Sequence, residues 1–98
     1  MRYQENRWAG NHWASIEVEP VDIAYFLPIL TYLSALYEFP MPTIDWDVDG
    51  YGADFEILGS KAIIKVDTWS FSIAFEKGVV RDQVLAVFRS LPSGYFRP

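Results

Sequence analysis

The chain lacks cysteine and has only one histidine, His12. Without cysteine, it forms no disulfide, no thiolate metal site and no cysteine nucleophile. One histidine cannot supply a metal site built on three histidines, and no recognisable catalytic partner for His12 is present. Phosphate-binding loops, nucleophile elbows and dinucleotide fingerprints are also missing. These absences predict a protein that is not an enzyme and that uses no cofactor.

Long hydrophobic runs are absent as well. The most apolar stretch, residues 23–39, is interrupted by Pro28 and Glu38. It is also shorter than the roughly 20 residues that a membrane span needs. The N-terminal residues are polar and contain two arginines, so they do not have the form of a secretory signal. We therefore expect a cytoplasmic protein that does not enter a membrane.

The composition fits one small folded domain covering residues 1–98. Half of the residues are hydrophobic (51%) and 21% are charged, so the chain can bury a core. It contains 17% aromatic residues, more than a core of this size can absorb, so some should remain at the surface. The net charge is −5, and direct nucleic-acid binding is not expected because phosphate contacts need a basic surface.

Hydrophobic periodicity predicts an α+β fold. Apolar residues at helical spacing predict helices over about 22–38, with Asp22 as the N-cap, and 80–91. Alternation of apolar and polar residues predicts strands. The expected strands are an N-terminal strand or hairpin (3–8 and 13–19), followed by 43–49, 53–58, 61–67 and 69–76. We expect an antiparallel meander of about four to five strands with two helices packed on one face.

The second face of the 69–76 segment carries small uncharged residues, Ser70, Ser72 and Ala74. Its other face is apolar and includes Trp69. Small, uncharged residues on an outer face indicate that something else covers that face.

Negative charge is concentrated in one segment, residues 45–56, which contains no basic residue. The whole chain has 13 acids and 8 bases, and without this segment the charges would balance. The five acids are Asp45, Asp47, Asp49, Asp54 and Glu56. Strand alternation places the aspartates of 43–49 on the solvent face and Ile44, Trp46 and Val48 on the opposite face.

One interpretation of this segment is a calcium site, because residues 45–56 resemble the calcium-binding loop of EF-hand proteins. Oxygen ligands stand at positions 1, 3 and 5, glycine at position 6 and glutamate at position 12. The ligands that this resemblance implies are Asp45, Asp47, Asp49, Tyr51 through its carbonyl and Glu56. The flanking residues, however, predict strands and prolines in place of the two helices of an EF-hand.

A second interpretation is an exposed hairpin that meets a basic protein. Like charges on paired strands destabilise a sheet by a few tenths of a kcal/mol or more, roughly, for each direct pair. A protein surface that keeps such charges together is suited to a partner of opposite charge. Aromatic residues dominate binding hot spots, and Trp13, Tyr32 and Tyr51 are the candidates that would accompany the acids. Acids on a solvent face also promote solubility and discourage edge pairing, which is the alternative explanation.

In size and charge the chain resembles the immunity proteins that neutralise bacterial toxins. This resemblance is one of type, and it assigns no role to any residue because those proteins share no motif. It implies a small acidic inhibitor that binds a basic toxin or nuclease directly, placing carboxylates where nucleic-acid phosphates would lie. A phage inhibitor of a bacterial defence system predicts the same features. The remaining alternative is a dimeric adaptor or secretion-type chaperone that pairs through the first helix, using Tyr32 and Leu36.

Overall fold

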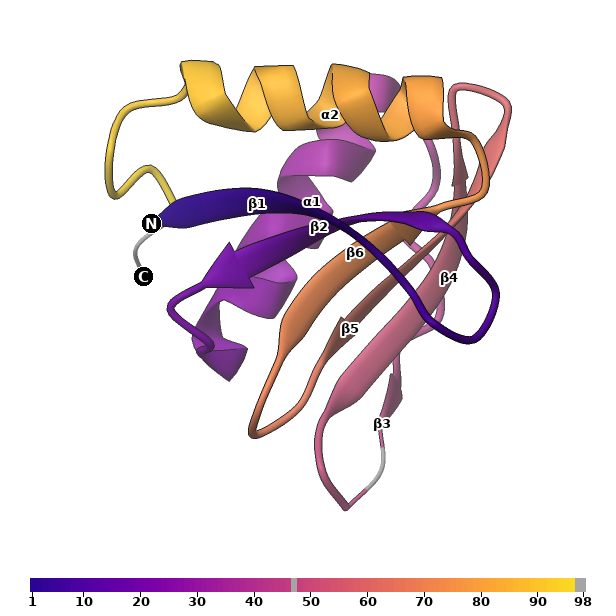
Figure 1. The fold of residues 1–98 in the computed structure, drawn as a ribbon. Coiled ribbons are helices and arrows are strands. Elements are labelled where there is room, and N and C mark those ends of the chain that lie inside the picture. The colour runs from indigo at the N-terminus through magenta and orange to yellow at the C-terminus, as the bar shows by residue number, and fades with distance from the viewer. Residues whose placement is uncertain (47, 97–98) are drawn as a thin grey trace.

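The computed structural model describes residues 1–46 and 48–96, and it has the expected α+β architecture (Figure 1). One antiparallel sheet contains six strands in the described residues, slightly more than the four to five predicted. They are β1 (Arg2–Arg7), β2 (Ala14–Glu19), β3 (Asp45–Trp46), β4 (Tyr51–Ile57), β5 (Ser60–Val66) and β6 (Phe71–Phe75). Their order across the sheet is β1-β2-β6-β5-β4-β3, so the N-terminal hairpin joins the rest of the sheet through β6.

Two helices connect and complete the sheet. A 3-10 turn, η1 (Ile23–Tyr25), leads into α1 (Phe26–Tyr37), and α2 (Gly78–Ser90) follows β6. The Asp22 side chain accepts a hydrogen bond from the amide of Ala24 at 2.9 Å, so it caps the helical segment as predicted. Pro28 lies in the first turn of α1, where an amide has no intrahelical acceptor, and it therefore does not interrupt the helix.

The core lies between the sheet and the helices, which cover one face together (Figure 1). The strands contribute alternate residues, such as Ile16, Ile64 and Ile73, all fully buried. The helices contribute residues spaced three or four apart, as predicted. These are Phe26, Ile29, Leu30 and Leu33 from α1 and Val80, Val84, Leu85 and Phe88 from α2.

No helix of the described residues is long and apolar enough to span a membrane.

The opposite face of the sheet is partly covered by the β1–β2 loop. The indole N–H of Trp8, in this loop, donates to Ser72 Oγ of β6 at 3.2 Å. Ser72 and its neighbour Ala74 are buried although no helix lies on this side. The prediction that something covers the small residues of this strand is confirmed for Ser72 and Ala74, whereas Ser70 lies in the turn before β6 and is exposed. Beyond β6, the outer part of the face, formed by β5, β4 and β3, stays open and carries the acidic residues. We call this part the open face.

Candidate functional site

Two loops meet at one end of the sheet and form a single surface. The connection from β3 to β4 carries Gly50, and the turn from β5 to β6 starts after Val66. A Cβ atom placed on Gly50 would lie 1.9 Å from the carbonyl oxygen of Val66 and 2.9 Å from Cα of Asp67. Only glycine allows the two backbones to approach this closely. The two loops are therefore held against each other.

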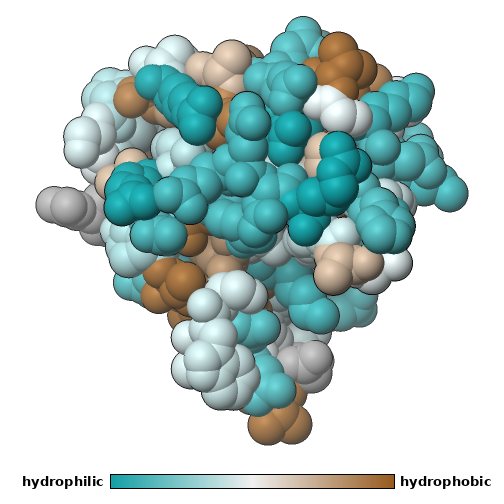
Figure 2. All heavy atoms as spheres, in the orientation of Figure 1, coloured by the Kyte–Doolittle hydropathy of each residue, from teal (hydrophilic) through white to brown (hydrophobic). Residues whose placement is uncertain are grey.

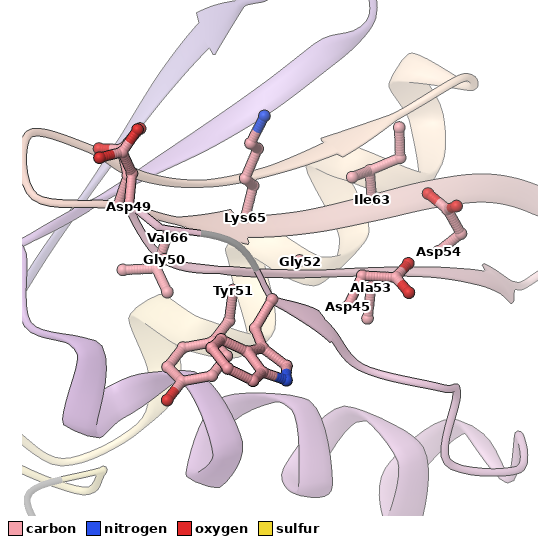
Figure 3. A pocket seen from close by; sticks show the side chains of 12 residues that line it. Asp45, Asp49, Gly50, Tyr51, Gly52, Ala53, Asp54, Ile63, Lys65 and Val66 are labelled. Atoms are coloured by element: carbon pink, nitrogen blue, oxygen red, sulfur yellow. The ribbon is translucent and has the colours of Figure 1, made fainter.

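Four carboxylates and one lysine line a shallow cavity of about 360 Å³ at this end. The charged residues of the lining are Asp45, Asp49, Asp54, Asp67 and Lys65. Figure 3 shows the side chains of Asp49, Asp54 and Lys65 on one side of the strands, whereas Tyr51 points to the other side, toward α1. A cavity with this surplus of negative charge favours a positively charged group over an anion or an apolar ligand.

Strand geometry explains why Asp54 and Glu56 share the open face. In β4, Ala53, Phe55 and Ile57 are buried and the residues between them are not, as period two requires. The prediction that Asp54 and Glu56 point to the exposed side is confirmed. Their cross-strand partners differ: Glu56 lies opposite Lys61, whereas Asp54 lies opposite Ile63. Asp54 therefore has no basic residue directly across from it on β5.

The expected strand 43–49 is wrong in length and in its buried face. β3 contains only two residues, which pair with Tyr51 and Gly52, and residues 48 and 49 form a bend. Trp46 is 76% exposed and Val48 is completely exposed, although alternation placed both toward the core. The reason is position, because β3 is the outermost strand of the sheet and Val48 lies in the bend beyond it. The predicted site residue Asp47 lies outside the described residues.

The geometry of the segment differs from an EF-hand loop. Glu56 would have to follow a wrapped loop and begin a helix, but it lies within β4, which is extended from Tyr51 to Ile57. On the other side, α1 ends at Tyr37, and no helix leads into Asp45. The described part of the chain contains no group of three or more acidic or histidine side chains able to hold a metal ion. The resemblance is therefore confined to the sequence pattern.

Exposed aromatic residues lie at the same end of the sheet as the carboxylates. Trp46 lies opposite Tyr51 in the β3–β4 pair, so their side chains share one face of the sheet. Trp69, in the turn between β5 and β6, is 77% exposed. We call the combined surface the acidic end; it consists of Asp45, Asp49, Asp54, Asp67, Trp46, Tyr51 and Trp69. At this end of the molecule, Asp49 and Asp54 thus lie on the open face, and Trp46 and Tyr51 lie on the other face of the same strands.

Asp67 organises the β5–β6 turn. Its carboxylate accepts hydrogen bonds from the amides of Trp69 and Ser70, both at 2.7 Å. These two bonds lower the pKa of Asp67 below its ordinary value, because they favour the charged form. Alternation had placed Trp69 in a strand with its side chain toward the core, and the structure corrects this. The signal for the turn was the Asp-Thr-Trp-Ser sequence, in which the aspartate can cap its own backbone two residues on.

The acidic end continues into an apolar surface beside α1. The ring of Tyr51 lies 5.9 Å from that of Phe26, and a cavity of about 380 Å³ separates Tyr51 from Ile23 and Leu27. Ile23 and Leu27 are each about half exposed. In Figure 2, hydrophobic surface also appears at the lower tip of the molecule, where the β3–β4 connection projects. The carboxylates therefore border an apolar area rather than a uniformly polar one.

The other predicted site residues lie outside the acidic end. Trp13 lines a separate shallow cavity with Glu56 and Lys61 on the open face. Tyr32, on α1, packs edge-to-face against Tyr95 and Phe96, with ring centroids 5.5 and 5.3 Å away. It therefore contributes to holding the C-terminal residues against α1. The structure thus brings together Asp45, Asp49, Tyr51 and Asp54, places Glu56 and Trp13 beside them, and separates Tyr32.

Comparisons of the chain with models of protein families, with curated proteins and with solved structures found no match. The fold itself defines the class, an α+β protein. Helices cover one face of its sheet, and the other face carries acidic residues at one end.

Proposed function

We propose that this chain is a non-enzymatic protein-binding module that holds a basic protein at its acidic end, in the manner of an immunity protein or inhibitor of a basic toxin or nuclease. The observation that carries the proposal is a cavity lined by four carboxylates with two largely exposed tryptophans beside it, Trp46 of β3 and Trp69 of the β5–β6 turn. Tryptophan and tyrosine anchor protein interfaces, and charges around them select the partner and speed the encounter.

Solubility alone explains the carboxylates but not the tryptophans. An indole that is about three-quarters exposed leaves a large apolar area in water, and the chain has two, one at the end of β3 and one in the β5–β6 turn. Exposed apolar surface bordered by polar residues marks interaction sites. The contact between Gly50 and Val66 also favours a binding role, because it fixes the two loops relative to each other before a partner arrives.

The charges indicate which partner is suitable. The cavity of the acidic end contains four carboxylates and a single lysine, so a lysine- or arginine-rich surface would find complementary charge there. Such surfaces occur on nucleases and on other proteins that bind phosphate backbones. A protein that covers them with carboxylates competes with nucleic acid for the same site, which is the inhibition we propose.

The test is a comparison of two variants with equal net charge. The site variant carries Asp45→Asn and Asp54→Asn, and the control carries Glu5→Gln and Glu38→Gln, which are exposed acids outside the acidic end. Each is co-expressed with basic proteins encoded beside this chain, and growth rescue is scored. For a rescued pair, titration calorimetry measures affinity at low and at physiological salt.

We expect the parent and the control to rescue growth and the site variant to fail. Affinity of the site variant should fall by about tenfold or more, since close charge pairs at interfaces contribute at least about 1.5 kcal/mol. Its affinity should also depend less steeply on salt. Equal losses in both variants would mean that only net charge matters, and rescue by the site variant would refute the proposed function.

A further inference from the structure

β4 is much longer than the strand on its outer side. β3 pairs only with Tyr51 and Gly52, whereas β4 continues to Ile57. Residues 53–57 therefore form a sheet edge that β3 does not pair with. We call these residues the open edge of β4.

The β4–β5 turn determines which backbone groups face outward along this edge. Leu58 and Gly59 both have positive φ, 51° and 74°, which is typical of a tight two-residue hairpin turn. In such a hairpin the flanking pair, Ile57 and Ser60, exchanges both backbone hydrogen bonds, and bonding then alternates along the strands. Asp54 and Glu56 consequently direct their N–H and C=O groups away from β5. No other residue that the structure describes hydrogen-bonds to these groups.

The chain segment before β3 leaves this edge unpaired. The ring of Phe39 stacks on that of Phe55 at 4.9 Å, on the buried side of β4, so the segment starts in the helix layer. It reaches the plane of the sheet only at Asp45. Pro40 and Pro42 lie between, and a proline has no N–H to add to a strand ladder.

The opposite edge of the sheet is protected in part. The bond from the amide of Trp8 to the carbonyl of Trp13 shows that Tyr3, Glu5 and Arg7 of β1 face outward. Arg89 of α2 donates to the carbonyl oxygen of Tyr3 at 3.1 Å, and the amide of Arg7 donates to the Asn6 side chain at 2.8 Å. Side chains thus occupy outward groups of β1, as is common for edges that must not pair. At β4 the corresponding groups have no such cover.

We propose that the open edge of β4 adds an extended lysine- or arginine-bearing segment of the partner as a further antiparallel strand. In antiparallel pairing, the residues opposite Asp54 and Glu56 would place their side chains on the same face as these carboxylates. Basic side chains there gain from cross-strand charge pairing. The inference rests on the proposed function and specifies how the partner is held.

A second copy of the chain is a poorer occupant. Two β4 edges pairing with each other would bring Asp54 and Glu56 of one copy against those of the other, and directly opposed like charges destabilise a sheet. Pairing of β4 with β1 of another copy would first require Arg89 and Asn6 to leave the backbone groups that they occupy. Charge therefore selects a basic segment as the occupant.

The first test uses the free protein. Amide hydrogen exchange, followed by NMR, should be fast at Asp54 and Glu56 and slow at Ala53 and Phe55, which bond to β5. Fast and slow amides should thus alternate along a single strand. Slow exchange at Asp54 and Glu56 in the free protein would show that the edge is already closed, and it would overturn the proposal.

The second test uses a capped heptapeptide of alternating lysine and valine as the probe. Its matched control is the same peptide with the backbone amide nitrogen of every lysine methylated. This change keeps the side-chain charge and removes the N–H donors that would face β4. We expect the unmethylated peptide to slow exchange at Asp54 and Glu56 by about tenfold or more, and the methylated peptide to lose this effect and to bind about tenfold more weakly.

The outcomes separate this proposal from the proposed function. Equal binding of both peptides without protection of the two amides would overturn strand addition and leave recognition by charge intact. Absence of binding by either peptide would also overturn strand addition, while the growth-rescue assay decides the proposed function independently. The proposal would be supported if the unmethylated peptide slows exchange at the amides of Asp54 and Glu56, both in the parent protein and in its control variant Glu5→Gln and Glu38→Gln.

Discussion

Replacing Gly50 by alanine should separate the two loops of the acidic end. The added methyl group would lie 1.9 Å from the carbonyl oxygen of Val66 and 2.8 Å from its carbonyl carbon. Non-bonded carbon atoms prefer separations of about 3.5–4.0 Å, so the backbone must move by more than 1 Å, roughly. The obstacle is backbone within a sheet, and no change of rotamer can relieve the collision. Either the β3–β4 connection moves outward or the end of β5 is distorted.

The expected loss of stability follows from the cost of inserting a methylene into a packed site, about 1–3 kcal/mol. For a domain of this size, each kcal/mol lowers the melting temperature by about 4–8 °C. Gly10→Ala is the matched control, because a Cβ at Gly10 has no atom within 4 Å. We expect a thermal melt of the Gly50 variant to show a clear decrease and that of the Gly10 variant to stay within about 0.5 kcal/mol of the parent.

Partner affinity provides the second readout of the same variant. If the contact holds the carboxylates in place, Gly50→Ala should weaken binding even at temperatures where the variant is fully folded. A variant that melts like the parent would refute the close approach of Gly50 to Val66. A variant that is destabilised but binds normally would show that the acidic end does not depend on this contact.

Three further predictions concern other polar groups. Ser15 is fully buried and its hydroxyl has no partner among the described residues. Ser15→Ala should therefore raise the free energy of unfolding, measured in urea, by about 1 kcal/mol. A lower free energy of unfolding would show that the hydroxyl is hydrogen-bonded. Burial raises the pKa of Glu17 above its ordinary 4.5, and the Asn6 amide opposes this in part. The folded state therefore binds this proton more tightly, and the resulting stability is lost as pH rises through the folded pKa. Glu17→Gln should be more stable than the parent at pH 7, by less than about 1 kcal/mol because the group is partly exposed, and the advantage should vanish below pH 4, roughly. Arg89→Ala should increase concentration-dependent association in sedimentation experiments, because it uncovers the carbonyl of Tyr3; unchanged association would argue against this protective role.

Local patterns predicted most of the fold. α2 begins and ends within two residues of its predicted bounds, and α1 ends within one, because capping and helical spacing act within one turn. The start of α1 differs by four residues, since the 3-10 turn η1 occupies residues 23–25. β4, β5 and β6 also followed from alternation. The pairing of β2 with β6 did not, since it joins residues such as Ile16 and Ile73 that no short pattern connects.

The site was predicted only in part. The alternation around Trp46 is the same for a half-buried strand and for an exposed edge, and only the position of β3 in the sheet distinguishes the two. Asp67 and Trp69 belong to the acidic end because Gly50 packs on the end of β5, and this contact depends on tertiary structure. Local pattern therefore identified Asp54 and Glu56 but could not identify their neighbours from the β5–β6 turn.

The position of β6 at the centre of the sheet has a consequence for how quickly the chain folds. β3, β4, β5 and β6 can pair in sequence order, each with a close neighbour along the chain. The N-terminal hairpin must instead find β6 across about 60 residues, with Ala14 opposite Phe75. Closing a long loop precedes the gain from such contacts, so distant pairings form slowly. The seam between β2 and β6 is therefore where we expect the folding rate to be determined, and substitutions there should slow folding more than substitutions in the β4–β5 hairpin.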